Sequence, residues 1–142
     1  MHIRPMQAED YDGVIALWDA TEGVAYHPGD ADSRPSVARF LRRNPGLSWV
    51  AEDEGQIVAA VLCGHDGRRG GLHHLAVAQS HRRRGLAQEM VQRCLEGLAG
   101  EGIAKCSILV FGDNRDGLAF WERNGWTRYP GELVFLQKRT DA

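Results

Sequence analysis

The chain has 142 residues and a net charge of −2, from 17 Lys and Arg against 19 Asp and Glu with histidine neutral. Its apolar fraction of 43% and charged fraction of 25% are those of an ordinary globular protein, which excludes disordered, collagen-like and coiled-coil classes. The length predicts a single domain over residues 1–142 with one hydrophobic core.

Localisation is predicted from what the sequence lacks. No run approaches the roughly 18 consecutive apolar residues that a membrane span needs. The first ten residues, MHIRPMQAED, lack the charged and apolar regions of a secretory signal. We therefore expect a cytoplasmic protein without a membrane partner. The cysteines Cys63, Cys94 and Cys106 lack C-x-x-C spacing and are expected to be reduced core residues.

The first half of the chain predicts a strand, two helices and a hairpin. The strand is expected at His2–Met6 and the first helix at Ala8–Ala20, where apolar residues recur at i, i+3, i+4 and i+7. Ser33 followed by Pro35 predicts the start of a second helix that ends near residues 44–46. Two β-rich runs, Leu47–Glu52 and Gln56–Gly64, are joined by Asp53-Glu54-Gly55 and are expected to pair antiparallel.

The second half predicts a strand, helix and strand crossover between Leu72 and Phe111. Its parts are a strand at Leu72–Val77, a helix from Gly85 to about Gly100, and a strand at Ala104–Phe111. A helix at Asp116–Arg123 and two strand-like pieces flanking Gly131-Glu132, the last at Leu133–Gln137, follow. This order predicts a mixed α/β (α+β) domain with a locally parallel crossover.

The most informative segment runs from Leu72 to Gln88 as a strand, a short polar loop and a helix that begins at a glycine. A helix start leaves backbone N–H groups unpaired and carries a positive partial charge, so it attracts anions. Arg82, Arg83 and Arg84 add cations at the same place. The spacing fits neither the phosphate loop of ATPases nor the G-x-G-x-x-G of dinucleotide folds.

Two motifs resemble those of the GCN5-related N-acetyltransferase (GNAT) superfamily. Arg82-x-x-Gly85-x-Ala87 resembles the family's acetyl-CoA motif, [Q/R]-x-x-G-x-[G/A], and follows a strand that ends at Val77. The segment from Asn114 to Trp126 is similar to the family's N-x-x-A-x-x-[F/x]-Y-x-x-x-G-F segment. The element order also matches. The resemblance implies a GNAT fold, a mixed and mostly antiparallel sheet whose fourth and fifth strands splay into a V around the central crossover.

The resemblance also implies an acetyl-CoA-dependent N-acetyltransferase that acts on a primary amine and uses no metal. In such enzymes the backbone of the fourth strand pairs with pantetheine and polarises the thioester carbonyl, and the loop before the crossover helix takes the pyrophosphate. Asn114 would contact the pantetheine arm, and Phe120 and Trp121 would line the slot near the sulfur. The implied cofactor-binding residues are Leu75, Ala76, Val77, Arg82, Arg83, Arg84, Gly85, Leu86, Ala87, Asn114, Phe120 and Trp121.

Two side chains are candidates for the proton chemistry. Regular strand alternation sends His73 and His74 to opposite sides, and places His73 on the side of Leu75 and Val77. Histidine accepts a proton near neutral pH, so His73 is the expected general base. Glu22 lies in the irregular stretch 21–32 after the first helix and is the second catalytic candidate, as a base or as a partner for a cationic amine.

One departure from the family pattern leaves alternatives open. The family commonly uses a tyrosine as acid toward the departing thiolate, but Trp121 stands at that position, and an indole N–H does not titrate near neutrality. Water, Tyr26 or Tyr129 could replace it, or the thiolate leaves with hydrogen bonds alone. A CoA-binding sensor without turnover is the alternative function, and a nucleic-acid-binding domain is a third reading that the net charge of −2 disfavours.

The partners are predicted only in outline. Acetyl-CoA and an amine acceptor are expected, the acceptor being a small amine, a peptide N-terminus or a lysine. His73, His74 and His81 lack thiol or carboxylate neighbours at ligand spacing, so no metal is expected. Trp126 and the last predicted strand, Leu133–Gln137, offer an apolar edge for a homodimer.

Overall fold

A computed structural model describes residues 1–141 and divides them into two compact units, Met1–Phe111 and the residues from Gly112 onward. Each unit is described by itself. The prediction of one domain over residues 1–142 stays a prediction. No helix within residues 1–141 is long and apolar enough to span a membrane.

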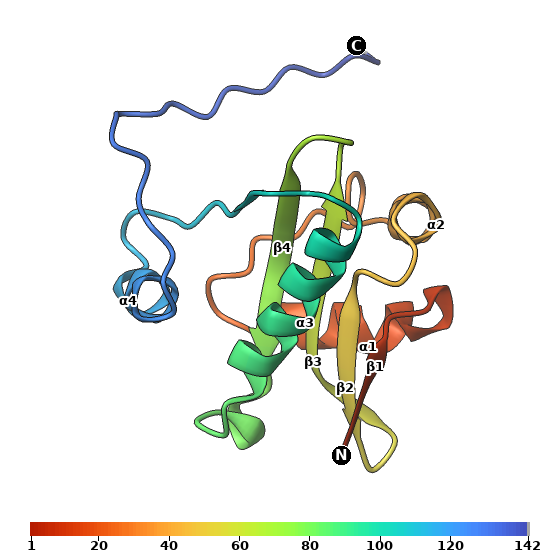
Figure 1. Ribbon diagram of the computed structural model, residues 1–142. Coiled ribbons are helices and arrows are strands. Elements are labelled where there is room, and N and C mark those ends of the chain that lie inside the picture. The colour runs from red at the N-terminus through yellow and green to blue at the C-terminus, as the bar shows by residue number, and fades with distance from the viewer. Residues whose placement is uncertain (142) are drawn as a thin grey trace. The chain divides into compact units, whose positions relative to one another are not determined.

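The first unit is built on a mixed sheet of five strands in the order β1-β2-β3-β4-β5 (Figure 1). The first four strands pair antiparallel, and β4 pairs parallel with β5 across the crossover helix α3, as the sequence predicted. The elements are β1 (His2–Pro5), η1 (Ala8–Asp10), α1 (Tyr11–Asp19), α2 (Arg34–Arg43), β2 (Trp49–Asp53), β3 (Gln56–His65), β4 (Gly70–Val77), η2 (Gln79–His81), α3 (Leu86–Gly100) and β5 (Cys106–Ser107).

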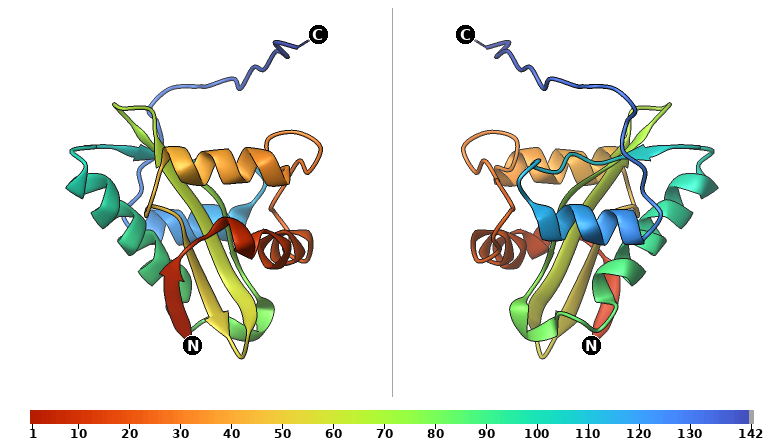
Figure 2. Two further views of the ribbon diagram at one scale, coloured as in Figure 1. Left: turned by 90° about the vertical axis from the view of Figure 1, so that its right-hand side faces the viewer. Right: turned by 90° about the vertical axis from the view of Figure 1, so that its left-hand side faces the viewer.

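Helices cover the sheet on both faces: α1 and α2 lie on one side and α3 on the other (Figure 2). On the first face, Val14 and Trp18 of α1 and Val37 of α2 are buried with the small strand residues Ala60 and Ala76. On the other face the buried side of α3 comprises Leu86, Met90, Val91, Cys94 and Leu98. Local signals set the helix ends: the Ser33 side chain accepts from the Ser36 N–H, and Gly85 with φ 74° begins α3.

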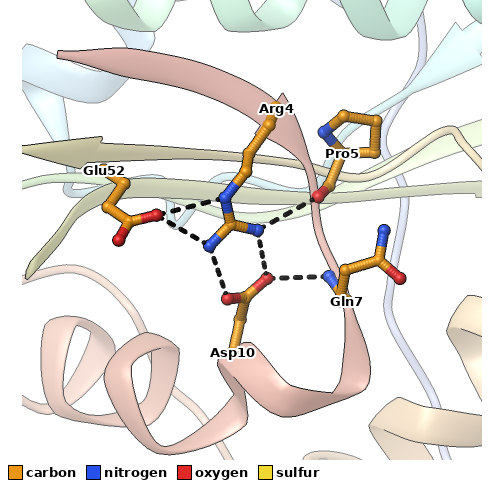
Figure 3. A network of polar contacts seen from close by, with 5 residues as sticks. All are labelled: Arg4, Pro5, Gln7, Asp10 and Glu52. Atoms are coloured by element: carbon orange, nitrogen blue, oxygen red, sulfur yellow. Dashed lines mark hydrogen bonds and ion pairs between the residues drawn. The ribbon is translucent and has the colours of Figure 1, made fainter. Parts of the chain in front are cut away.

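The entry into α1 is fixed by one arginine (Figure 3). Arg4 of β1 donates to both carboxylate oxygens of Asp10, each at 2.8 Å, and to Glu52 of β2 at 3.0 and 3.2 Å. Asp10 also accepts from the Gln7 N–H at 2.8 Å. Burial alone would raise the pKa of Asp10, but the hydrogen bonds from Arg4 and Gln7 hold it below its usual value. The predicted single helix Ala8–Ala20 is therefore a 3-10 turn followed by α1.

An extra residue interrupts the pairing of β3 with β4. Leu62 lies opposite His73 and Ala60 lies opposite Ala76, so His74 and Leu75 together face Val61. His74 has φ 55°, a left-handed conformation that is uncommon outside glycine. The buried Trp18 donates from Nε1 to the His74 carbonyl at 3.0 Å. This β-bulge is thus anchored by a core side chain of α1.

The last predicted strands differ from the structure. The strand expected at Ala104–Phe111 is reduced to Cys106–Ser107, which pairs only with Gly70 and Gly71. Residues 127–141 hold no strand in the described part of the chain, although Leu133–Leu136 is an apolar, exposed run. A strand needs partner N–H and C=O groups as well as a suitable sequence, and these segments lack the pairing.

The second unit contains α4 (Arg115–Arg123), close to the predicted Asp116–Arg123. The Asn114 side chain caps it by accepting from the Gly117 N–H at 2.9 Å. The Trp121 ring packs edge-on against both Phe120 and Trp126, with centroids 5.2 and 5.0 Å apart. Gly125, with φ 89°, ends the helix as the sequence predicted.

Candidate active site

The free edge of β4 is the first part of the candidate site. Beyond Gly71, β4 has no β5 partner within residues 1–141, because the parallel pairing ends at Ser107. Ala76 lies in register with Ala60 of β3, and Ala78 N–H bonds to Val58 of β3 at 2.7 Å. Since backbone groups alternate in direction along a strand, the N–H and C=O of Val77 point to the open side. An extended ligand arm therefore finds backbone donors and acceptors here.

The loop from Arg82 to Ala87 is the second part. Arg83 and Gly85 have φ of 63° and 74°, and α3 begins with the bond from Glu89 N–H to the Gly85 carbonyl at 3.1 Å. The N–H groups of residues 86–88, in the first turn of α3, have no carbonyl partner within the helix, as at any helix start. A side chain at Gly85 would meet open space, and the three arginines are exposed. This combination suits an anion that approaches the backbone closely.

Two contacts tie this loop to the strands. Arg82 Nε donates to the Val77 carbonyl at 3.0 Å, so one arginine occupies a backbone acceptor of the β4 edge. His81 Nε2 lies 2.7 Å from Asp53 Oδ2 at the β2–β3 turn. The hydrogen bond to His81 lowers the pKa of Asp53, helped by the charges of the N-terminus and Arg84. The loop is therefore held at the end of the β4 edge.

A histidine and a buried carboxylate meet beside the β-bulge. His74 Nε2 lies 3.0 Å from Oδ2 of Asp32, whose side chain is 6% exposed. The same carboxylate oxygen accepts from the His27 N–H at 2.8 Å. Burial would raise the pKa of Asp32, but the hydrogen bonds from His74 and His27 lower it below its usual value. The His74 ring also packs edge-on against Trp18 at 4.8 Å.

His73, the base expected from the sequence, is exposed and packs edge-on against Phe40 at 6.0 Å. Its ring makes no side-chain hydrogen bond within residues 1–141. Desolvation by neighbouring atoms lowers the pKa of His73, and the charge of His74 lowers it further. The predicted alternation was wrong: the bulge places His73 on the face of Ala76, under α1 and α2, while Val77 lies on the other face.

Glu22 lies where it was expected, in the segment between α1 and α2, and is exposed. In the described part of the chain its carboxylate forms no hydrogen bond or ion pair. Tyr26 of the same segment donates from its hydroxyl to Asp19 at 2.9 Å, and this bond raises the pKa of Tyr26. The segment places its polar groups at the surface around the buried Asp32.

Comparisons with known proteins identify the family. A family model described as acetyltransferase (GNAT) family matches residues 12–126. The chain belongs to the GNAT acetyltransferase family. An acetyltransferase of Yersinia pestis (strain Pestoides F) is 34% identical over 139 residues, covering 98% of this chain and 95% of that protein. Acetyltransferase SG1711 of Sodalis glossinidius is 32% identical over 123 residues, covering 87% of this chain and 84% of that protein.

Solved structures show the same GNAT fold. An aminoglycoside antibiotic 6'-N-acetyltransferase from Acinetobacter haemolyticus has a TM-score of 0.78 at 17% identity, covering 99% of this chain and 100% of that one. A PaiA N-acetyltransferase from Thermoplasma acidophilum in complex with coenzyme A has a TM-score of 0.78 at 16% identity, covering 92% of both chains. The resemblance inferred from the two motifs is confirmed, and the protein is an acetyl-CoA-dependent N-acetyltransferase.

The remaining predicted site residues of this GNAT protein lie in the second unit. Asn114, Phe120 and Trp121 are half-buried. The side-chain oxygen of Asn114, Oδ1, already accepts the hydrogen bond from Gly117 N–H that caps α4. The side-chain roles that the resemblance implies for them stay predictions. Among residues 1–141 no group of three or more His, Cys, Asp or Glu side chains is placed to hold a metal ion.

The cysteines are free, as expected. Cys63 and Cys94 are buried, and Cys106 is half-buried. A hydrogen bond with Cys63 and burial together raise the pKa of Cys94, and burial raises that of Cys106 to about 12. Thiols with raised pKa values are poor nucleophiles, so Cys94 and Cys106 act as packing residues rather than as reactive groups.

Sequence reasoning missed the pair of His74 with Asp32. The two residues are 42 positions apart, and no spacing rule joins a loop carboxylate to a strand histidine. The one signal in the sequence was the adjacent pair His73 and His74 within a strand. A histidine on the face of the sheet that helices cover needs a polar partner, and this need could have pointed to a nearby carboxylate.

Proposed function

We propose that this GNAT acetyltransferase transfers the acetyl group directly from acetyl-CoA to a primary amine, with both substrates bound together, in the cytoplasm. The observation that carries the proposal is the continuity of the β4 edge with the start of α3. The unpaired edge ends at Val77, and the exposed turn at Gly85 follows after η2. Backbone donors for an extended arm and for a phosphate thus occur in one short stretch.

In this proposal the coenzyme lies along that stretch. The pantetheine arm lies along Leu75, Ala76 and Val77 and pairs with those backbone groups of this stretch that point away from β3, as an added strand would. The pyrophosphate lies at residues 82–87, where the N–H groups of Leu86 and Ala87 and the exposed arginines neutralise it. A backbone N–H of the strand polarises the thioester carbonyl, which stabilises the oxyanion that forms on attack. Coenzyme-binding roles are also proposed for Asn114, Phe120 and Trp121 of the second unit, on the family resemblance alone.

The acceptor is proposed to be a cationic amine of a small molecule, a peptide N-terminus or a lysine. Charge supports this class: residues 19–32 contain four carboxylates and no Lys or Arg. Glu22 is exposed there and is the proposed partner of the ammonium group. The amine must lose a proton before its nitrogen attacks the carbonyl carbon, and His73 is the acceptor that the sequence predicts.

The departing thiolate is proposed to be protonated by solvent. The Trp121 indole N–H does not titrate near neutrality. The Tyr26 hydroxyl is already directed at Asp19, 2.9 Å away, and its raised pKa favours retention of the proton. Tyr129 is 66% exposed and belongs to the second unit. A thiolate is a good leaving group, so hydrogen bonds from water are sufficient for its departure.

The experiment measures both coenzyme binding and thiol release. Calorimetry with acetyl-CoA is done on the parent, on Gly85→Glu and on Gly67→Glu, a matched control because both glycines have positive φ and open space around them. We expect binding to be lost in Gly85→Glu alone. Free thiol is then followed with a panel of primary amines, and steady release with any of them supports transfer. Unchanged affinity in Gly85→Glu would overturn the proposed coenzyme site.

A second candidate function is a CoA-binding sensor without turnover, favoured by Trp121 in place of the usual tyrosine acid. It predicts coenzyme binding by calorimetry without thiol release from any amine. A homodimer through Trp126 and the exposed run Leu133–Leu136 is a separate part of the proposal. Sedimentation of the parent against Leu133→Lys tests it, because a charge in that run would dissociate a dimer.

A further inference from the structure

Asp32 determines which nitrogen of His74 carries the hydrogen. The lowered pKa of Asp32 keeps its carboxylate ionised at neutral pH, and an ionised carboxylate only accepts hydrogen bonds. His74 Nε2, 3.0 Å from Oδ2, must therefore carry the hydrogen and donate it. In the neutral ring the lone pair then lies on Nδ1. The described residues 1–141 offer Nδ1 no hydrogen-bond partner.

The backbone of His74 is fixed as firmly as its ring. Its carbonyl accepts from Trp18 Nε1 at 3.0 Å, and the Trp18 side chain is fully buried. The His74 ring packs edge-on against the same indole at 4.8 Å. Fixed orientation matters for proton transfer because a base contributes only when its lone pair is held in reach of the proton.

His74 is also reachable. Its side chain is 22% exposed, whereas that of Asp32 is 6% exposed, so the ring meets solvent and the carboxylate lies behind it. The bulge places His74 two residues before Ala76, on the strand whose free edge is the proposed thioester site. His73, its neighbour, has neither a carboxylate partner nor a hydrogen-bonded ring among the described residues.

We propose that Nδ1 of His74, with Asp32 as its positioning residue, takes the proton from the acceptor amine. The inference rests on the proposed transfer to an amine. An ammonium group gives one proton to Nδ1 and becomes the neutral nucleophile. Its nitrogen bonds to the thioester carbonyl carbon, and the carbon–sulfur bond breaks with the electron pair on sulfur. The second amine proton goes through solvent to the thiolate, and the imidazolium returns its proton to bulk water.

The charges around His74 favour this role. Asp32 accepts its Nε2–H and stabilises the imidazolium. The other titratable groups nearby are His73 on the same strand, His27 in the loop, and Tyr26 with Asp19 beside Trp18. His73 and His27 oppose a positive charge on the ring, whereas the buried carboxylate of Asp32 is hydrogen-bonded to it and favours that charge.

The test compares His74→Gln with His73→Gln. Glutamine keeps an amide N–H that can reach Asp32 but has no basic nitrogen. In His74→Gln we expect kcat for thiol release to fall about 10²-fold or more, with the Kd for acetyl-CoA from calorimetry unchanged. His73→Gln is expected to lower kcat less than His74→Gln does. His65→Gln, whose ring pairs with Glu101 instead of Asp32, is the control expected to stay within about threefold of the parent. The opposite ranking would overturn the proposal and return the role to His73.

Asp32→Asn supplies an independent readout. Without the carboxylate the imidazolium is less stable, so the acidic limb of the kcat/KM profile should move to lower pH, which a purely structural role would not produce. An unmoved limb contradicts the proposal even if His74→Gln unfolds. A parent that releases no thiol with any amine refutes the proposed function. In that case 15N shifts still test the pair, because hydrogen on Nδ1 of His74 would refute the assigned tautomer.

Discussion

The indole of Trp18 and the backbone of His74 form a hydrogen bond of 3.0 Å across the interface between α1 and β4. The acceptor is the carbonyl of a bulged residue, which regular strand pairing would direct toward a neighbouring strand. The core of the α1 face and the geometry of the candidate site are therefore coupled through one side chain.

Trp18→Phe tests this coupling. We expect a loss of about 2–4 kcal/mol in the free energy of unfolding, from the unpaired carbonyl and the space left by the smaller ring. Trp49→Phe is the matched control, because the buried Nε1 of Trp49 has no hydrogen-bond partner in the part of the chain described. Urea denaturation should show the smaller loss for Trp49→Phe, and equal losses would contradict the role of the hydrogen bond.

Gly64→Ala should be destabilising because α2 packs directly on β3 there. A Cβ at Gly64 would lie 2.7 Å from Phe40 Cζ and 2.7 Å from Asn44 Cγ. Overpacking of this kind costs about 1–3 kcal/mol. Gly29→Ala, which meets nothing within 4 Å, is expected to change the melting temperature little. A thermal unfolding scan that finds the two variants equal would disprove the close packing.

The free energy of unfolding should fall at acid pH, because Asp32 stabilises the fold only while its carboxylate is ionised. Its folded pKa is lowered, so its contribution is complete above the unfolded value of about 3.9 and is lost as pH falls through the folded value. The urea midpoints of the parent and Asp32→Asn should therefore differ at pH 7 and converge in strongly acid solution. A difference that persists there would assign the effect to packing rather than to charge.

Arg83 and Arg84 are expected to contribute to acetyl-CoA binding through their charge and to contribute little to the stability of the fold. Both are exposed, and exposed ion pairs contribute about 0.2–1 kcal/mol each, so replacing both by Ala should weaken acetyl-CoA binding about fivefold. The weakening should diminish as salt is raised, and the melting temperature without ligand should stay unchanged. Arg42→Ala with Arg43→Ala on α2 is the control, and equal weakening there would argue against a local anion site.

Local sequence signals predicted most of the first unit. Ser33 with Pro35 marked the start of α2, Gly85 marked the start of α3, and the Asp53-Glu54-Gly55 turn gave the hairpin between β2 and β3. These features depend on a few neighbouring residues, which is why they can be read from sequence. The coenzyme motif was equally local, and the family comparison confirmed the resemblance.

The features that sequence reasoning missed depend on contacts between distant parts of the chain. The bulge arises where β4 meets Trp18, 56 residues earlier in the chain, so strict alternation assigned His73 to the wrong face. Asp32 is buried only because a loop folds over His74. Residues 108–111 have strand-like composition, but the structure provides them with no neighbouring strand.

The bulge in β4 also makes chain length critical at one point. Deleting Leu75 would restore one-to-one pairing with β3, with His73 still opposite Leu62 and Ala76 still opposite Ala60. His74 would then pair with Val61, and its side chain would turn to the face away from Trp18 and Asp32. A deletion of the same size in the exposed turn 66–69 would be absorbed by the loop. Among natural variants of this protein we therefore expect insertions and deletions to collect in the turn and to be absent between His73 and Ala76.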